Sequence, residues 1–208
     1  KDVTPPDMPP EGRIQTIDPS PHDASKAYFA GYRTLLGDFR PFIYKTEDYG
    51  ESWTLLTPGD NGIPSHHPTR AVREDPVREG LLYAGTEFGM FVSFDDGGSW
   101  EQFQLNLPRT PITDIKVHQN DLVLSTMGRA FWIMDNITPL RQGGEAIESG
   151  LAAGGPNFLD PLDAYRIRGG GGGGGSPDQP RYSRRGAELD YTLDDDANSV
   201  RIEIMDEA

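Results

Sequence analysis

The feature that most constrains this chain is a short acidic loop that occurs twice. Ser93–Trp100 reads SFDDGGSW and Thr46–Trp53 reads TEDYGESW, so both fit the pattern S/T-x-D-x-G-x-S/T-W. Each loop follows a stretch in which apolar and polar residues alternate as in a strand, Met90–Phe94 and Pro41–Lys45. A shared loop after a shared strand pattern predicts an internal repeat.

Each fixed position of the loop has a physical role. Asp folds its carboxylate back onto nearby backbone N–H groups, Gly adopts a positive φ, the hydroxyl residues bind the loop to itself, and Trp buries a large apolar ring. A turn Asp usually serves its turn, so we expect a structural loop rather than a catalytic Asp48 or Asp95. The predicted structural residues are Thr46, Asp48, Gly50, Ser52, Trp53, Ser93, Asp95, Gly97, Ser99 and Trp100.

The repeat covers a unit of short strands of about 40–47 residues, a length typical of a four-stranded propeller blade. YFAGY (Tyr28–Tyr32) aligns with LYAGT (Leu82–Thr86), and an insertion, Arg33–Arg40, separates the second and third strands of the first copy. In the third copy LVLSTMGRAFWIMD (Leu122–Asp135) aligns without a gap with LYAGTEFGMFVSFD (Leu82–Asp95). The other predicted strands are Arg13–Ile17, Lys26–Tyr32, Thr69–Glu74, Leu81–Thr86, Ile112–His118, Asp121–Thr126 and Ala130–Met134.

These patterns predict an all-β chain: an incomplete ring of about three propeller blades, followed by the start of an immunoglobulin-like β domain. The blades are expected at about 13–57, 69–105 and 111–140, within 13–140. Residues 1–12 read as a Pro-rich linker, and 141–186 as a Gly-rich linker. The third acidic loop has decayed, so its blade needs an outer strand from elsewhere, with 163–168 as the nearest candidate. Residues 187–208 predict a hairpin, Glu188–Leu193 with Ser199–Met205.

Composition limits the class of partner. Gly 25 and Pro 18 suit many short strands joined by turns. The net charge of −14 argues against nucleic acid and anionic membranes, and no apolar run approaches the length of a membrane span. Zero cysteines exclude disulfides and thiolate metal sites. Three blades cannot close a ring, because propellers use typically 4–8; the chain therefore reads as a fragment, whose companion blades lie on another chain or segment.

The acidic loops and three longer stretches, Asp38–Trp53, Val72–Trp100 and Asn120–Gln142, resemble the Asp-box (bacterial neuraminidase repeat) propellers. More closely, they resemble the last blades of large secreted bacterial proteins of the sortilin-like or glycosyl hydrolase type. This resemblance implies an extracytoplasmic location; the fragment itself carries no signal peptide. Met127 departs from it, since such proteins often have His before this Gly-Arg.

Successive antiparallel strands turn at alternate ends, so the acidic loops share one end of the blades and the turns between second and third strands share the other. Ligands of closed propellers usually meet the second end, as the resemblance implies. The expected ligand-binding residues there are Glu87, Arg129, Arg40, His66 and His67, and the weak catalytic candidates are Glu87, Glu74 and Asp38. An alternative is that these charges are ordinary solvated or ion-paired turn residues.

Other chemistries find less support. A glycoside hydrolase needs two carboxylates flanking one sugar bond, and no motif marks a pair. A sialidase needs an arginine cluster and a Tyr nucleophile, but the spacing of Arg73, Arg129 and Tyr32 does not support that assignment. The side chains of His66-His67 diverge and lack a third metal ligand. Asp194, Asp196 and Asn198 begin like a calcium loop, but Ser199 and Met205 stand where it needs Gly and Glu.

We therefore expect a binding or scaffold module for a protein or glycan partner, as part of a larger protein, with no metal and no cofactor. The first alternative is a glycoside hydrolase of the sialidase or xyloglucanase type, with its catalytic residues mostly outside this fragment. The second is an accessory subunit that assembles on a larger complex.

Overall fold

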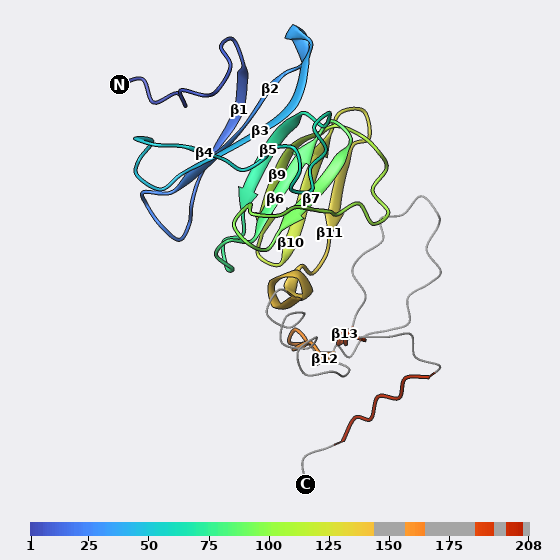
Figure 1. The fold of residues 1–208 in the computed structure, drawn as a ribbon. Helices are drawn as coiled ribbons and strands as arrows, with labels where there is room; N and C mark the ends of the chain where they lie inside the picture. The colour runs from blue at the N-terminus through green and yellow to red at the C-terminus, as the bar shows by residue number, and fades with distance from the viewer. Residues whose placement is uncertain (144–156, 165–185, 194–198, 206–208) are drawn as a thin grey trace. The chain divides into compact units, whose positions relative to one another are not determined.

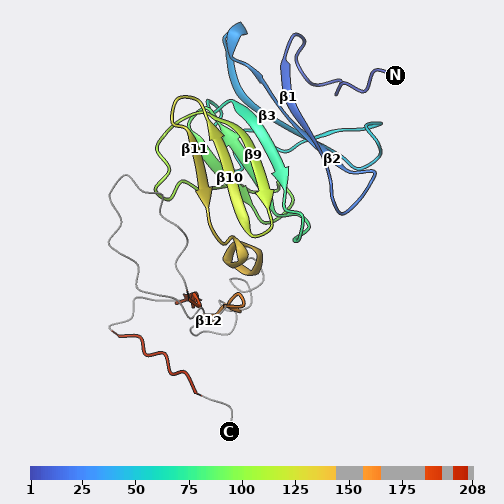
Figure 2. The ribbon, with the colours of Figure 1, turned by 180° about the vertical axis from the view of Figure 1, so that it is seen from behind.

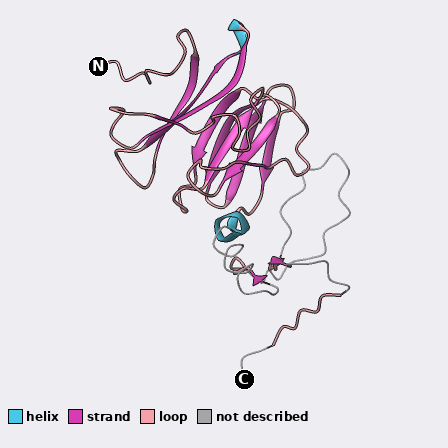
Figure 3. Ribbon diagram, viewed as in Figure 1, coloured by secondary structure: helices cyan, strands magenta, loops and turns pink. Residues whose placement is uncertain are grey.

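The computed structural model describes residues 1–143, 157–164, 186–193 and 199–205. The chain divides into two compact units, Lys1–Ile137 and Thr138–Ala208. The first unit consists almost entirely of strands and connecting loops, apart from one short 3-10 helix, η1 (Thr34–Leu36) (Figure 3). The fold is all-β, as predicted.

The first unit contains three antiparallel sheets in which sequential strands are neighbours. The first sheet contains β1 (Arg13–Pro19), β2 (Ala27–Arg33), β3 (Asp38–Thr46) and β4 (Thr54–Leu55). The second contains β5 (Thr69–Glu74), β6 (Leu82–Thr86), β7 (Gly89–Ser93) and β8 (Glu101–Gln102). The third contains β9 (Ile112–His118), β10 (Asp121–Thr126) and β11 (Phe131–Met134). These meanders are propeller blades, here called the first, second and third blade.

The second blade lies between the other two, because β5 contacts β1 and β2 on one side and β9 on the other (Figure 1). Seen from behind, β9, β10 and β11 lie side by side (Figure 2). In the second blade β6 and β7 are fully buried and β5 is largely buried, whereas the outer strand β8 is exposed. Strands buried on both faces are apolar throughout, which is why β6 and β7 do not alternate strictly between apolar and polar residues.

The register of the first blade corrects the predicted alignment by one residue. Phe29 pairs with Tyr44, as Ala84 pairs with Phe91. Tyr44 and Phe91 hold the same place before their acidic loops, so Phe29 corresponds to Ala84, not to Tyr83. The predicted insertion is also shorter, since β2 continues to Arg33 and β3 already begins at Asp38. The predicted alignment placed Gly31 on Gly85, and this match concealed the register shift. Turn length and strand register are coupled, so the longer β2–β3 turn could not be seen from the alignment.

The third blade also departs from the gapless alignment. Leu124 pairs with Trp132, whereas the alignment would pair it with Phe131. The β10–β11 turn is one residue longer than the β6–β7 turn and contains Gly128 and Ala130 at positive φ (87° and 59°). A one-residue shift exchanges the faces of a strand. Trp132 therefore faces the second blade, and Phe131 is 76% exposed.

Residues 1–12 form more than the predicted linker. Met8 packs onto Phe29, Phe42 and Tyr44 on the face of the first blade that points away from the second. A Cβ at Gly31 would lie 3.0 Å from the Met8 Cε, so the glycine makes room for this side chain. Met8 and Pro5 are the buried residues of this segment, so part of it packs against the protein instead of running free as a linker.

In the second unit the predicted hairpin is wrong in its pairing. β13 (Tyr191–Thr192) pairs with β12 (Asn157–Phe158), and residues 199–205 belong to no strand. Residues 138–143 are helical, against the expectation of linker from 141. The end of the candidate outer strand (165–168) and most of the candidate calcium loop (194–198) lie outside the described residues. No helix in the described part of the chain is long and apolar enough to cross a membrane.

Candidate functional site

The two acidic loops have the same hydrogen bonds, atom for atom. Asp48 Oδ1 accepts from the Thr46 hydroxyl and the Ser52 amide, both at 2.8 Å. Its Oδ2 accepts from the Ser52 hydroxyl at 2.5 Å. Asp95 accepts the equivalent bonds from Ser93 and Ser99 at 2.7–2.8 Å. Both carboxylates are therefore engaged by their own loops.

The protonation of these carboxylates follows from their donors. The Ser52 hydroxyl and amide, with Thr46, lower the pKa of Asp48 to about 2. For Asp95, burial acts to raise the pKa, but the bonds from Ser99 and Ser93 outweigh it and the net shift is downward. Neither Asp is suited to act as a general acid near neutral pH.

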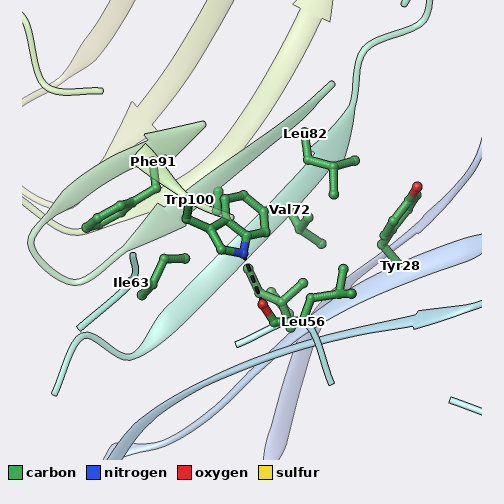
Figure 4. Packing of buried hydrophobic residues seen from close by; sticks show 10 residues of the cluster. Tyr28, Leu56, Ile63, Val72, Leu82, Phe91 and Trp100 are labelled. Atoms are coloured by element: carbon green, nitrogen blue, oxygen red, sulfur yellow. Dashed lines mark hydrogen bonds between the residues drawn. The ribbon is translucent and has the colours of Figure 1, made fainter. Parts of the chain in front are cut away.

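The two tryptophans that close the loops differ in burial. The Trp100 ring is 4% exposed and lies in a cluster with Phe91, Ile63 and Leu56 (Figure 4). Its Nε1 donates to the Leu56 carbonyl at 3.0 Å. Trp53 is only partly buried beside Phe29, and its Nε1 donates to the Val3 carbonyl at 2.7 Å. Each indole thus binds the backbone of the segment that precedes its blade.

A buried ionic cluster joins the first two blades at the end that holds the acidic loops, called the loop end. Lys26 Nζ lies 3.5 Å from Glu74 Oε1 and 3.2 Å from Asp96 Oδ1. Tyr28 donates to Asp96 at 2.5 Å and to Glu74 at 3.3 Å, and Lys45 lies 2.8 Å from Asp96. The prediction that Glu74 lies with Glu87 is corrected, because β5 starts at Thr69 beside the β6–β7 turn and ends at Glu74 at the loop end.

Arg73 connects all three blades through their first strands. Its guanidinium donates to Asp18 of β1 at 3.0 Å, and to Asp114 and the Ile115 carbonyl of β9 at 2.9 and 2.8 Å. Tyr32 lies at the other end of the sheet, where it pairs with Arg13. The structure therefore does not bring together the sialidase set of Arg73 and Tyr32.

The opposite end, called the turn end, carries the β2–β3, β6–β7 and β10–β11 turns, and its two candidate carboxylates are both paired with arginine. Arg33 and Arg40 lie 2.7 and 2.8 Å from Asp38 Oδ2. The hydrogen bonds from Arg40, then Arg33, outweigh partial burial and lower the pKa of Asp38 far below its usual value. Arg70 forms a 2.5 Å ion pair with Glu87. These contacts pair both acids with arginine side chains of the same end.

Two arginines of the turn end are different. Arg109 lies over the Phe88 ring, 5.7 Å from its centroid, and Arg129 is exposed in the β10–β11 turn. Within the described residues neither guanidinium forms an ion pair or a hydrogen bond. The two segments are adjacent, because Thr110 donates to the Met127 carbonyl at 3.2 Å. Exposed apolar side chains accompany them: Leu35, Leu36, Phe39, Phe88 and Met127.

The two histidines also lie at the turn end. His67 is buried, with its ring 4.8 Å from that of Phe88, and its Nδ1 has no hydrogen-bond partner among the described residues. Burial, then His66 and Arg109, lower its pKa, so the ring is held neutral. His66 is exposed. Among the described residues no group of three His, Asp or Glu side chains is arranged to hold a metal ion.

Glu87, Arg40, Arg129, His66 and His67 lie at the turn end, as predicted from the sequence. Their neighbours Arg109 and Phe88 were not predicted. A signal for Arg109 was available. The segment Leu107–Thr110 enters the first strand of the third blade, just as the His66-His67 segment enters that of the second. Connections that enter first strands end at the turn end, so Arg109 belongs there.

A scan against models of protein families finds no match, and a search of curated proteins finds no relative. Solved structures share part of the fold. A GH74 enzyme of Niastella koreensis has a TM-score of 0.47 and 14% identity over 59% of this chain and 21% of that chain. The GH74 xyloglucanase of Xanthomonas campestris has a TM-score of 0.42 and 15% identity over 59% and 22%. YCF48 bound to D1 peptide has a TM-score of 0.44 and 18% identity over 64% and 42%. The chain thus spans about a fifth of the length of the two GH74 structures.

Proposed function

We propose that this chain is a segment of an Asp-box propeller, related to the sortilin-like secreted proteins, and that it works as a binding and scaffold module. Two loops with the same carboxylate bonds and the same closing indole support the Asp-box assignment. In this proposal the loop end is structural and the turn end binds the partner. The companion blades and the extracytoplasmic location are parts of the same proposal and rest on the resemblance of the sequence.

The observation that carries the binding role is the distribution of charge at the turn end. Its acids Asp38 and Glu87 are neutralised by arginine, while Arg109 and Arg129 keep unpaired positive charges. The whole chain has a net charge of −14, so this positive surface stands out from the rest of the protein. Exposed Phe88 and Met127 beside the two arginines add apolar area. A polypeptide with carboxylate and apolar side chains complements both properties.

The test measures binding of the full chain to a fluorescently labelled peptide of glutamate and phenylalanine, by polarisation. A peptide with glutamine for each glutamate is the ligand control. We expect the acidic peptide to bind more tightly, and Arg109→Ala with Arg129→Ala to weaken it about tenfold, the value of about 1.4 kcal/mol of lost charge interaction. Lys116→Ala, an exposed cation on β9, is the protein control and should leave affinity unchanged. Equal binding of both peptides would refute the proposal.

The glycosidase alternative has its own test. A glycosidase of the two-carboxylate type needs one protonated and one ionised carboxyl group about 5–9.5 Å apart. Glu87 and Asp38 are both paired with arginines, and the pKa of Asp38 lies far below its usual value. Turnover of fluorogenic glycosides by the full chain that is abolished in Glu87→Gln would favour the enzyme over the binding module.

A further inference from the structure

In the described residues, the third blade has no outer strand like those of the other two. β4 pairs with β3, and β8 pairs with β7. In the described part of the chain no strand pairs with the outer edge of β11. The residues of β11 therefore present an unpaired row of backbone N–H and C=O groups, which is a template for another strand.

The third blade also lacks the indole that accompanies an outer strand. Trp53 stands directly before β4 and Trp100 directly before β8, and each ring binds the carbonyl of a preceding segment. After β11 the chain continues as Asp135-Asn136-Ile137, without a tryptophan. In the described part of the third blade, both the tryptophan and the outer strand that follows it in the other two blades are therefore absent.

An apolar groove lies where this third indole belongs. It is lined by Met90, Phe103, Leu107, Leu122, Leu124, Trp132 and Met134, with further residues of the 104–106 loop. The strand pairings show that this groove corresponds to the site of Trp100 in the second blade. The pair Leu124 and Trp132 corresponds to the pair Ala84 and Phe91, and Trp100 packs against the latter pair. Phe91 is 3% exposed beneath the Trp100 ring, whereas Trp132 is only half-buried.

The groove also offers the matching acceptor. The Leu56 amide donates to the Ile43 carbonyl, and the Leu56 carbonyl then accepts the Trp100 indole. The Phe103 amide donates in the same way to the Met90 carbonyl, so the Phe103 carbonyl corresponds to that of Leu56. No described residue donates a hydrogen bond to the Phe103 carbonyl. An indole N–H is therefore the donor that this position lacks.

We propose that the groove and the β11 edge together bind an extended strand of a partner polypeptide that carries a tryptophan. The two residues after the tryptophan pair with β11, as Thr54–Leu55 pair with β3 and Glu101–Gln102 with β7. The indole enters the groove and donates to the Phe103 carbonyl. Strand addition supplies affinity through the backbone, and the groove supplies specificity for the aromatic side chain. This site is distinct from the turn-end arginines, so it goes beyond the function proposed above.

The chain itself supplies the probe. A labelled peptide with the sequence of residues 98–104, GSWEQFQ, contains the tryptophan and outer strand of the second blade. We expect the full chain to bind it, and the version with alanine for tryptophan to bind about 30–100-fold more weakly, the value of burying one large aromatic side chain. Equal binding of both peptides would overturn the proposal.

A matched pair of protein variants locates the binding. Leu124→Trp fills the groove from within and should abolish binding. Val123→Trp adds the same ring one position earlier, on the opposite face of β10, and should leave binding unchanged. The wild-type protein gives an independent readout if Leu124→Trp fails to fold. With an unlabelled peptide, the indole N–H signal of Trp132 in a ¹⁵N spectrum should shift, while those of Trp53 and Trp100 stay. A shift of Trp100 instead would mean exchange with β8 and would overturn the proposal.

Two further results assign the edge to another occupant and would also overturn the proposal. One is a dimer of the chain that the peptide dissociates, since it gives the edge to a second copy. The other is displacement of the probe by a peptide of residues 161–170 in preference to the tryptophan peptide, since it gives the edge to the chain's own continuation. The turn-end probe contains glutamate and no tryptophan, so failure of either proposal leaves the other measurable.

Discussion

Replacing Trp100 with alanine tests the central structural claim, that a buried indole closes the second acidic loop. The ring is 4% exposed and packs among Leu56, Ile63 and Phe91, so its removal leaves a cavity between two blades. Large-to-small changes of this kind cost about 3–5 kcal/mol. The lost hydrogen bond adds at most about 1 kcal/mol, because Asn61 Nδ2 still donates to the Leu56 carbonyl at 2.9 Å.

Trp53→Ala is the matched control, because Trp53 occupies the same place in the other loop but is only partly buried. We expect a loss of about 1–2 kcal/mol there. Both variants are measured in the full chain by urea unfolding, followed by far-ultraviolet circular dichroism. With a slope of about 1–3 kcal/mol/M, the Trp100 variant should lower the midpoint by at least about 1 M. A loss below about 1 kcal/mol, or equal losses in the two variants, would refute the reasoning.

Three other residues, two of them with a matched control, have defined outcomes in the same assay. Gly62→Ala should lower the stability by more than about 3 kcal/mol, since φ is 115° and the new Cβ would lie 1.8 Å from the Trp100 carbonyl oxygen. Its control Gly37→Ala, with φ 75° and no atom near the new Cβ, should lower the stability by about 1 kcal/mol. Equal losses would contradict the close packing at Gly62. Arg73→Leu should lower the stability by about 3 kcal/mol because it leaves the carboxylate of Asp18 without its buried cation. Its control Arg201→Leu breaks an exposed ion pair with Glu203 and should lower the stability by less than about 0.5 kcal/mol. The pKa of His67 is lower in the folded than in the unfolded protein, so its contribution to folding stability is present above the unfolded pKa of about 6.5 and is lost as the pH falls through the folded pKa. His67→Leu should therefore flatten the decline in stability between about pH 7 and 5. An unchanged slope would show that His67 does not cause this decline.

The elements that the sequence predicted well are those that depend on local physics. β5, β9 and β10 have the predicted bounds, because alternation of apolar residues and flanking turn residues act within a few positions. The carboxylate bonds of Asp48 and Asp95 are local too, spanning no more than four residues. Whether the loops belong to the Asp-box family stays a proposal, as do the domain boundaries.

The errors all concern relations between elements. The registers of β2 and β11 were each one residue wrong, because Gly37, Gly128 and Ala130 adopt positive φ in turns whose length no alternation pattern reveals. Glu74 was placed at the wrong end, although the direction of β5 already determines its position. Pairing of β13 with Asn157–Phe158 depends on a segment far away in the sequence. Arg109 was missed because its role depends on Phe88, from another turn.

The structure suggests that the stabilising unit is a blade together with the segment that precedes it. Val3 and Met8 contact the first blade as Leu56 and Ile63 contact the second: one supplies a carbonyl to the indole and the other an apolar side chain to the core. Phe103 and Leu107 are in place to do the same for the third, but they line an open groove. Each blade therefore depends on three contributions, from its own sheet, the preceding segment and an indole. In the third blade no described residue supplies the indole or the strand that follows it. Because the other two contributions are present, the groove already has apolar walls and a backbone acceptor for an incoming tryptophan, and such pre-formed groups favour its binding.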